Sequence, residues 1–249
     1  MIAESFPQVK LLRSPENLGF ARGYNRAAAE ATGRFLLLLN PDTVTQPGAL
    51  RTLIEFLHAT PQAGAAGPRL LNPDGSLQFS CRRFPRPVAA LFRNTPLGKL
   101  FPRNKYTRDY LMTDWSHAEA RAVDWISGAA ICLRRETWEQ VGGFDEGFFM
   151  YAEDMDWCLR VRRAGWGFFY VPQAVVLHCI GRSSDQAPVR MVIQFHRSMA
   201  HFYLKHYAPA WPLPVRWLPV IGVWLRCGVV LLETLWSLAR NRLRPKVIT

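Results

Sequence analysis

Residues 35–43 read FLLLLNPDT, five apolar side chains followed by a turn-forming Asn-Pro-Asp sequence. A short apolar run that stops at turn-forming residues is typical of a strand buried in a parallel sheet. Helical patterns flank this run, in the alanine-rich segment 20–32 and in segment 47–59, and a further strand is predicted at 63–71. This alternation of strands and helices predicts an α/β domain.

The rest of the chain continues the same alternation. Further strands are predicted at 9–12, 168–171 and 175–179, together with a strand-like stretch at 123–133 that residues 127–129 interrupt. Helices are predicted at 135–141, 153–164 and 189–207, and a hairpin at 72–80. Residues 84–118 are rich in proline, arginine and aromatic residues without a clear period, so we expect loops with one short helix there. We expect one domain over residues 1–208 and a distinct C-terminal segment over residues 209–249.

The composition excludes several classes of protein. Of the 249 residues, 49% are hydrophobic and 20% are charged, so the chain can form a core and is not globally disordered. The net charge of +12 favours an anionic partner: nucleic acid, anionic lipid or a phosphorylated substrate. Because the sequence has no helix-turn-helix, RNP or zinc signature, we do not expect nucleic acid to be the partner. Five cysteines without a CxxC pair argue against a disulfide framework and favour a reducing compartment.

The C-terminal segment contains an apolar run, 220–238, that Arg226 and Glu233 interrupt. A membrane-spanning helix needs about 20 residues with few charges, so two charges near the middle argue against a span. The tryptophans of this run and the basic residues that follow it are typical of a helix lying on an anionic membrane surface. We expect such a peripheral helix. The alternatives are a spanning helix and a helix packed against protein.

Two groups of acidic residues are candidates for catalysis. Asp42 follows a strand, and ligands of open α/β sheets bind at the carboxyl ends of the strands. A carboxylate there can hold Mg²⁺ or Mn²⁺ on a diphosphate, although a turn or capping role is also common. Glu153 and Asp154 begin a predicted helix, whose dipole favours ionised carboxylates. An ionised Asp154 can act as a general base, with helix capping as the alternative.

His178 and a glycine-containing loop are further candidates. Neutral imidazole is a ligand for Mn²⁺-class metals, although a lone histidine at a strand end is more often only hydrogen-bonded. Loop 17–25 leads into a helix and offers backbone N–H groups to a phosphate or ribose. The loop is neither GxGxxG nor a P-loop with its lysine, so the sequence gives no support for NAD or ATP binding.

Taken together, five segments resemble the family 2 glycosyltransferases, and within them the bacterial rhamnosyltransferase-type members. The segments are ENLGFARGYN at 16–25, FLLLLNPDT at 35–43, WISGAAICLRR at 125–135, VGGFDEGFFMYAEDMDWCLRVRRAGW at 141–166 and LHCIGRSS at 177–184. The resemblance implies a GT-A fold, a Rossmann-like mixed sheet flanked by helices, that binds a nucleotide-sugar donor. It also implies transfer of a sugar, with rhamnose as the candidate, to a glycan or polyprenyl-linked acceptor. The protein would be cytoplasmic and peripheral on the inner face of the cell membrane.

The resemblance also implies a role for each candidate residue. Asp42 would bind the divalent metal at the family's DxD-like motif, whose first position is Asn40 here, and His178 would help to hold that metal. Asp154, with Glu153 beside it, would deprotonate the acceptor hydroxyl in a single inverting displacement. The other implied residues are Asn17, Gly19, Asn25 and Asn40 beside the donor, and Trp125, Gly128 and Ala129 beside the acceptor.

The family's domain opens with a strand, a helix and a second strand that have no counterpart before Val9. The resemblance therefore implies an N-terminally incomplete domain, in which FLLLL would expose an apolar sheet edge, a state that proteins avoid. We expect weak binding of nucleotide-sugar by this chain. An inactive remnant or an interaction module is the alternative to an enzyme.

Overall fold

The structure is a computed structural model that describes residues 2–85, 98, 100–179 and 187–243. A mixed sheet of seven strands forms its body within these residues. The main strands lie in the order β1 (Phe35–Leu39), β8 (Ala130–Arg134), β3 (Ala63–Leu71), β9 (Gly167–His178) and β2 (Thr43–Thr45). β3 and β9 run parallel, and the other neighbours in this order run antiparallel.

Four two-residue strands complete the described strands. β4 (Leu77–Gln78) pairs with β3 and β6 (Arg121–Ala122) pairs with β9. β5 (Cys81–Arg82) and β7 (Trp125–Ile126) form a separate small sheet. The predicted hairpin at 72–80 is therefore present, because β4 turns back onto β3 through a turn closed by the Asn72 N–H, which donates to the Ser76 carbonyl.

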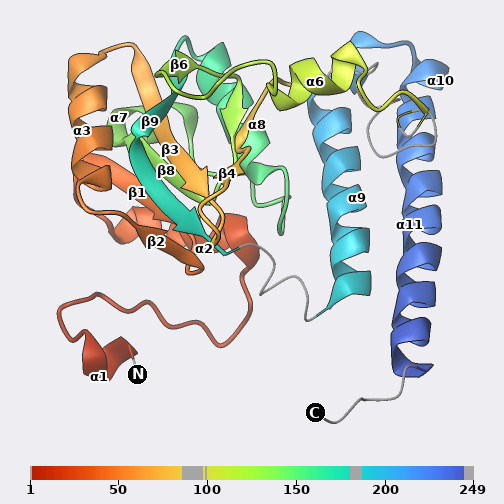
Figure 1. Cartoon of the computed structure of the whole chain (residues 1–249), viewed down its shortest axis with the longest axis horizontal. Coiled ribbons are helices and arrows are strands. Elements are labelled where there is room, and N and C mark those ends of the chain that lie inside the picture. The colour runs from red at the N-terminus through yellow and green to blue at the C-terminus, as the bar shows by residue number, and fades with distance from the viewer. Residues whose placement is uncertain (1, 86–97, 99, 180–186, 244–249) are drawn as a thin grey trace.

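Helices cover both faces of the sheet. On one face lie α2 (Gly19–Glu30), α7 (Arg135–Val141) and α8 (Glu153–Arg163), which share a buried core with β1 and β8. On the other face lies α3 (Ala49–Ala59), which buries Leu53 and Leu57. The predicted mixed α/β sheet flanked by helices is confirmed, and the order of elements places the carboxyl ends of β1 and β9 near the start of α2 (Figure 1).

Three strand predictions need correction. Residues 9–12 form no strand but lie in an N-terminal arm, after α1 (Ile2–Ser5) and away from the sheet (Figure 1). Since no described strand lies beside them, their backbone groups gain no ladder partner. Residues 167–178 form one strand, and a shift of register against β3 after Val171 explains the broken pattern. β1 was predicted to lie inside a parallel sheet. In the described sheet it lies at one edge and pairs only with β8, which runs antiparallel to it.

Two long helices stand beside the body, α9 (Pro188–His206) and α11 (Leu218–Leu243), with α9 between the body and α11 (Figure 1). The turn that joins them contains η1 (Ala208–Ala210) and α10 (Leu213–Arg216). Within 84–118 the structure describes the short helix α6 (Lys105–Leu111). α11 packs one face on α9, where Val220 and Cys227 are buried. The predicted C-terminal apolar helix is thus present, and most of its length is exposed.

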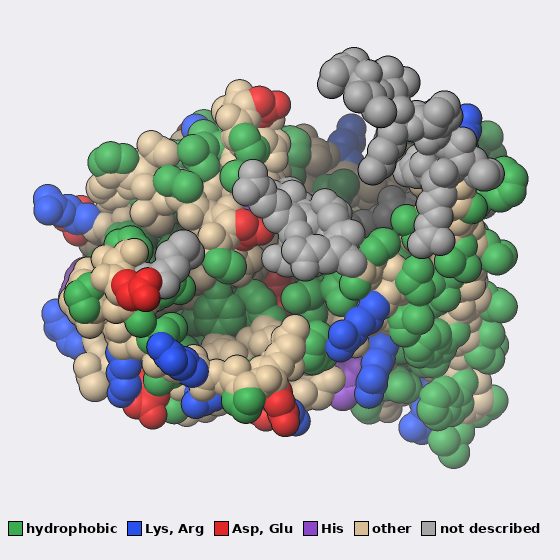
Figure 2. Space-filling view, turned by 90° about the horizontal axis from the view of Figure 1, so that it is seen from below, with side chains coloured by type: hydrophobic (Ala, Val, Ile, Leu, Met, Phe, Trp, Pro, Cys, Tyr) green, Lys and Arg blue, Asp and Glu red, His purple; other side chains and the backbone are tan. Residues whose placement is uncertain are grey.

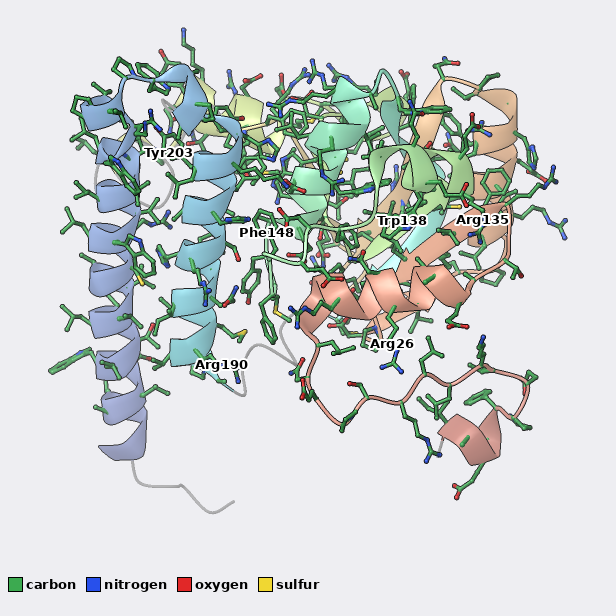
Figure 3. The ribbon with its side chains drawn as sticks, turned by 180° about the vertical axis from the view of Figure 1, so that it is seen from behind. Arg26, Arg135, Trp138, Phe148, Arg190 and Tyr203 are labelled. Carbon is green, nitrogen blue, oxygen red and sulfur yellow. The ribbon has the colours of Figure 1, made fainter. Side chains whose placement is uncertain are left out.

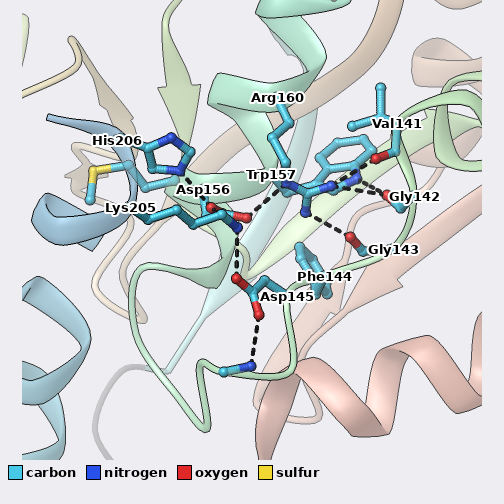
Figure 4. Close-up of polar contacts among 12 residues, drawn as sticks. Val141, Gly142, Gly143, Phe144, Asp145, Asp156, Trp157, Arg160, Lys205 and His206 are labelled. Atoms are coloured by element: carbon cyan, nitrogen blue, oxygen red, sulfur yellow. Dashed lines mark hydrogen bonds and ion pairs between the residues drawn. The ribbon is translucent and has the colours of Figure 1, made fainter. Parts of the chain in front are cut away.

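A buried carboxylate, Asp156, ties α8 to α9 (Figure 4). Its Oδ1 accepts from His206 Nε2 at 2.6 Å and lies 2.7 Å from Lys205 Nζ, while its Oδ2 accepts from Arg160 Nε at 2.9 Å. Burial raises the pKa of Asp156, but the hydrogen bonds from His206, Lys205 and Arg160 outweigh it and lower the pKa to about 2. Asp156 therefore holds the helix pair against the body through charge-assisted contacts.

The loop before α8 also packs against α9. Phe148, labelled beside α9 in Figure 3, is buried against His201, with ring centroids 4.5 Å apart. Lys205 Nζ lies 5.8 Å from the centre of the Phe148 ring. Ser198 Oγ donates to the Met150 carbonyl at 2.8 Å. The backbone that leads into Glu153 is therefore fixed from the α9 side.

Candidate active site

A cavity of about 880 Å³ lies at the carboxyl ends of β1 and β9, between the starts of α2 and α8. Figure 2 looks into this hollow, and hydrophobic side chains line much of its floor. All predicted site residues except Asn25 line it: Asn17, Gly19, Asn40, Asp42, Trp125, Gly128, Ala129, Glu153, Asp154 and His178. Segments that are up to about 160 residues apart in the chain thus meet in one place.

Asp42 and His178 meet because β2 pairs with the end of β9. Thr43 stands opposite His178 in the antiparallel register, and the Cys179 N–H donates to the Asp42 carbonyl at 2.9 Å. This pairing leaves His178 Nε2 3.4 Å from Asp42 Oδ1. The imidazole is buried, and the Asp42 oxygen is itself buried with no hydrogen-bond partner among the described residues.

Gln78 determines which nitrogen of His178 faces Asp42. The Gln78 Nε2 donates to Asn72 Oδ1 at 2.9 Å and to the His178 carbonyl at 3.3 Å. Its Oε1 is therefore the acceptor for the Nδ1–H of His178, at 2.7 Å. In the neutral imidazole, Nε2 then carries a lone pair directed at the Asp42 carboxylate. Two such electron-rich atoms facing each other fit a divalent cation held between them.

The described residues supply only part of a metal coordination shell. They contain no cluster of three or more His, Cys, Asp or Glu side chains placed to hold a metal ion. A cation at Asp42 and His178 would therefore need oxygens from a substrate or from water. This is the usual arrangement for Mg²⁺ and Mn²⁺ on a substrate diphosphate, where one or two protein ligands suffice.

Asp154 lies in the first turn of α8 and is held by two backbone donors. Its Oδ2 accepts from the Gly128 N–H at 2.8 Å, and its Oδ1 accepts from the Met155 N–H at 2.7 Å. Burial raises the pKa of Asp154, and the hydrogen bonds from Gly128 and Met155 offset only part of this effect. A fixed carboxylate with a raised pKa is suited to accept a proton as a general base.

Glu153 shares the same corner of the cavity. Burial, followed by the charge of Asp154, raises the pKa of Glu153 well above its usual value, and its Oε2 is buried without a hydrogen-bond partner in the described structure. Because two adjacent carboxylates resist ionising together, the pair titrates as a unit. The two residues before Glu153 have left-handed backbones, Tyr151 with φ 69° and Ala152 with φ 66°. Such strained residues cluster at functional sites, at a cost of about 1–3 kcal/mol each.

The predicted donor residues divide into two groups. Asn17 accepts from the Gly19 N–H at 3.0 Å, and Gly19 has φ +73°, with space so limited that a Cβ would lie 2.4 Å from the Phe149 carbonyl oxygen. Asn40 accepts from the Tyr24 hydroxyl at 3.3 Å. Asn17, Gly19 and Asn40 therefore shape this wall of the cavity.

Asn25, expected beside the donor, does not line the cavity. Its Nδ2 donates to the Phe144 carbonyl at 2.9 Å, and its Oδ1 accepts from the Phe144 N–H at 2.8 Å. The side chain is thus used to clamp α2 to the loop after α7. The structure corrects the prediction for this residue, because its polar atoms point into the protein rather than toward a ligand.

The predicted acceptor residues belong to β7 and the β7–β8 connection, next to Asn40 at the end of β1. Trp125 donates its Nε1–H to the Arg83 carbonyl at 3.0 Å, and the Ala129 carbonyl accepts from the Asn40 N–H at 2.9 Å. The cavity lining continues with Phe195 and Met199 of α9 and with Arg226 of α11. The sequence did not predict Phe195, Met199 or this position of Arg226, because each reaches the cavity through tertiary packing that has no local sequence signal. It also did not predict Gln78, which holds His178 rather than lining the cavity.

Comparison with known proteins identifies the family. A family model described as glycosyltransferase like family 2 matches residues 1–197. The chain is also 32% identical over 252 residues to the N-acetylglucosaminyl-diphospho-decaprenol L-rhamnosyltransferase of Mycobacterium tuberculosis, covering 97% of this chain and 81% of that protein. This chain is a family 2 glycosyltransferase. The glycosyltransferase is also 30% identical over 168 residues to rhamnosyltransferase WbbL of Escherichia coli, covering 64% of this chain and 60% of WbbL.

Solved structures agree with this fold. The mannosyltransferase PcManGT from Pyrobaculum calidifontis, in complex with GDP-Man and Mn²⁺, superposes with a TM-score of 0.50 at 18% identity, covering 98% of this glycosyltransferase and 61% of that chain. GalNAc-T7 with UDP, GalNAc and Mn²⁺ gives a TM-score of 0.51 at 17% identity, covering 72% of this chain and 33% of that one. The predicted GT-A-like fold and the predicted family are confirmed.

Proposed function

We propose that this glycosyltransferase moves an L-rhamnosyl group from a nucleoside diphosphate donor to a sugar carried on a polyprenyl diphosphate. The observation that carries the proposal is the single cavity that contains the Asp42–His178 pair and the Asp154 carboxylate. The relative from Mycobacterium tuberculosis, which is named for a diphospho-decaprenol acceptor and for L-rhamnosyl transfer, supports the choice of substrates.

The chemistry follows from the positions of these side chains. Asp42 and His178 would hold a divalent cation, Mg²⁺ or Mn²⁺, and this cation would supply stabilisation of the charge that develops on the leaving diphosphate. Asp154 takes the proton of the acceptor hydroxyl as that oxygen attacks the anomeric carbon. Gly128 and Met155 keep the carboxylate in place during the attack. One displacement of this kind inverts the anomeric configuration.

We assign the donor and the acceptor to two adjoining groups of lining residues. Asn17, Gly19 and Asn40 lie on the wall formed by α2 and β1, which we assign to the nucleotide-sugar. Trp125, Gly128 and Ala129 lie on the wall shared with the β7–β8 connection, which we assign to the acceptor sugar. The reacting atoms would then meet beside Asp154, where both walls converge.

α11 supports a location at the membrane surface. The helical stretch Leu213–Arg240 is long and apolar enough to cross a bilayer, and little of it is buried. Its outward residues include Leu225 and Leu232, with exposed fractions of 68% and 70%, and Trp236, with 73%. Figure 2 shows hydrophobic side chains gathered along this edge of the molecule. We assign α11 to the membrane interface on the cytoplasmic side, next to a lipid-linked acceptor.

The proposal is tested by a transfer assay with the full chain. The protein is incubated with Mn²⁺ or Mg²⁺, with nucleoside diphosphate donors including rhamnose, and with a short-chain N-acetylglucosaminyl-diphospho-prenol. We expect metal-dependent transfer of rhamnose in preference to glucose, mannose and N-acetylgalactosamine. A folded protein that transfers none of these sugars would contradict the proposal and would favour the inactive alternative.

A further inference from the structure

We propose that Arg226 of α11 binds the diphosphate of the lipid-linked acceptor, and so sets how deeply the acceptor sugar reaches toward Asp154. The inference rests on the proposed function and adds a binding residue from a part of the chain that the family model does not cover. That model ends at residue 197, whereas Arg226 lies in the middle of α11 and lines the same cavity as Asp42 and Asp154.

The position of Arg226 on its helix is the first argument. The surrounding stretch of α11 is apolar, yet Arg226, Glu233 and Arg240 recur every seven residues and so lie along one face. This face borders the side that packs on α9, where Cys227 is buried, and it differs from the outward apolar side of Leu225 and Leu232. An arginine placed in an apolar helix, half-buried and turned to a cavity, is suited to bind an anion there.

The distribution of charge in the cavity is the second argument. Among the described lining residues, the Lys and Arg side chains are Arg82 and Arg226. Arg82 belongs to β5 and lies close enough to Asp154 to act on its charge. Arg226 comes from the helix pair instead. The donor diphosphate has its own site at Asp42 and His178, so the acceptor diphosphate needs a second cationic group, and Arg226 supplies it on the lipid side.

The apolar wall between these points is the third argument. Phe195 and Met199 of α9 line the cavity on the side from which Arg226 reaches it. Beyond Arg226, the outward side of α11 is exposed and apolar. An acceptor with its sugar at Asp154 and its diphosphate at Arg226 would therefore direct its prenyl chain along α11 toward the membrane. A sugar, a diphosphate and a hydrocarbon chain then each meet a matching surface.

The test compares two variants of the full chain. Arg226→Met removes the charge but keeps an apolar stem that suits the helix, and Arg240→Met makes the same change on the same helix outside the cavity-lining residues. Binding of geranylgeranyl diphosphate is measured with Mn²⁺ and saturating nucleoside diphosphate, which occupy the donor site. We expect Arg226→Met to weaken binding at least about tenfold, the loss of one charge-assisted contact, and Arg240→Met to change it less than about twofold.

Transfer kinetics separate this inference from the proposed function. For Arg226→Met we expect a raised KM for N-acetylglucosaminyl-diphospho-prenol, and an unchanged KM for octyl N-acetylglucosaminide, which has no phosphate. Arg226→Lys, which keeps the charge, should recover part of the affinity and guards against a folding defect. Equal binding of geranylgeranyl diphosphate by the unaltered protein and Arg226→Met would overturn the inference even if transfer occurs. Absence of all transfer with intact, Arg226-dependent binding would contradict only the proposed reaction.

Discussion

The Gly128 N–H donates to Asp154 Oδ2 across 2.8 Å and joins the β7–β8 connection to the first turn of α8. The two residues are also in close contact, because a Cβ on residue 128 would lie 3.4 Å from the Asp154 Cβ and 3.2 Å from the Phe20 ring. Glycine at 128 therefore lets the backbone approach the carboxylate, and the hydrogen bond then fixes the carboxylate's direction. Both effects depend on a residue without a side chain.

Gly128→Ala should lower kcat while the protein stays folded. The added methyl group must displace Phe20 or Asp154 by a few tenths of an ångström, and an error of this size at a base costs roughly tenfold or more. The change is measured as kcat for transfer, with circular dichroism to check the fold. Gly228→Ala on α11, where a Cβ meets nothing within 4 Å, is the matched control. Equal kcat values for both variants would show that Gly128 does not position Asp154.

Gln78→Leu should weaken the affinity for Mn²⁺ without removing a metal ligand. The substitution deletes the acceptor that holds the Nδ1–H of His178 and lets the imidazole rotate. Loss of such an outer contact costs about 10–100-fold in metal affinity. The Mn²⁺ concentration for half-maximal activity should rise accordingly. Gln46→Leu changes a residue of the same type that makes no side-chain hydrogen bond to His178 in the described structure, and it should leave this concentration unchanged. An unshifted metal titration for Gln78→Leu would show that Gln78 does not orient a ligand.

Asp156 should make the stability of the protein depend on acid pH. Its pKa is about 2 when folded and near 3.8 otherwise, so its ionised form is favoured by folding. The contribution, about 2 kcal/mol, is fully present above roughly pH 4 and is lost as the pH falls toward 2. Asp156→Asn should lower the free energy of unfolding by roughly 2–4 kcal/mol at pH 7, since Lys205 and His206 lose a buried charge partner.

Urea unfolding at pH 7 and near pH 2.5 measures this difference. The gap between the unaltered protein and Asp156→Asn should narrow at the lower pH, where the native carboxyl is partly protonated. Asp114→Asn, which makes the same change at an exposed residue, should have little effect at either pH. A gap that stays constant between the two pH values would show that the contribution of Asp156 is not electrostatic.

Leu232→Glu on α11 should weaken binding to vesicles that contain anionic lipid. The Leu232 side chain is 70% exposed. Burying a leucine in the membrane interface contributes about 1.5–3 kcal/mol to the free energy of binding, and a carboxylate at this position removes that contribution. We expect at least a tenfold loss in vesicle cosedimentation. Leu50→Glu changes an exposed leucine on α3, which lies on the opposite side of the body from α11 (Figure 1), and it should bind like the unaltered protein. Equal losses for both variants would contradict a membrane role specific to α11.

Local sequence patterns predicted an element of the fold correctly where the pattern depends on that element alone. The FLLLL run formed β1, and the acids that start α8 and the arginines that end it matched its dipole. The prediction for residues 9–12 was wrong, because an apolar run becomes a strand only beside another strand. β2 was not predicted, since three residues carry no period of their own and the strand exists only by pairing with β9.

The candidate site was predicted only in part. The residues Asp42, Asp154 and His178 came from motifs and a family resemblance, and the structure places them around one cavity. Asn25 showed the limit of this approach, because a motif position does not reveal which way its amide points. The left-handed backbone at Ala152 and the approach of Arg226 depend on packing between distant segments, which no local pattern encodes.

The proposed reaction depends on Asp154 removing the proton of the acceptor hydroxyl, a claim that the Asp154→Asn variant tests. The measurement is kcat for rhamnose transfer at saturating donor, acceptor and Mn²⁺, across a range of pH. In the unaltered protein, kcat should rise with pH as Asp154 loses its proton, at a pH above the usual range of aspartate because burial raises its pKa. In Asp154→Asn, kcat should fall about 10²–10⁴-fold, with that rise abolished. A variant that keeps kcat within about threefold of the unaltered protein, with the same pH dependence, would contradict the claim.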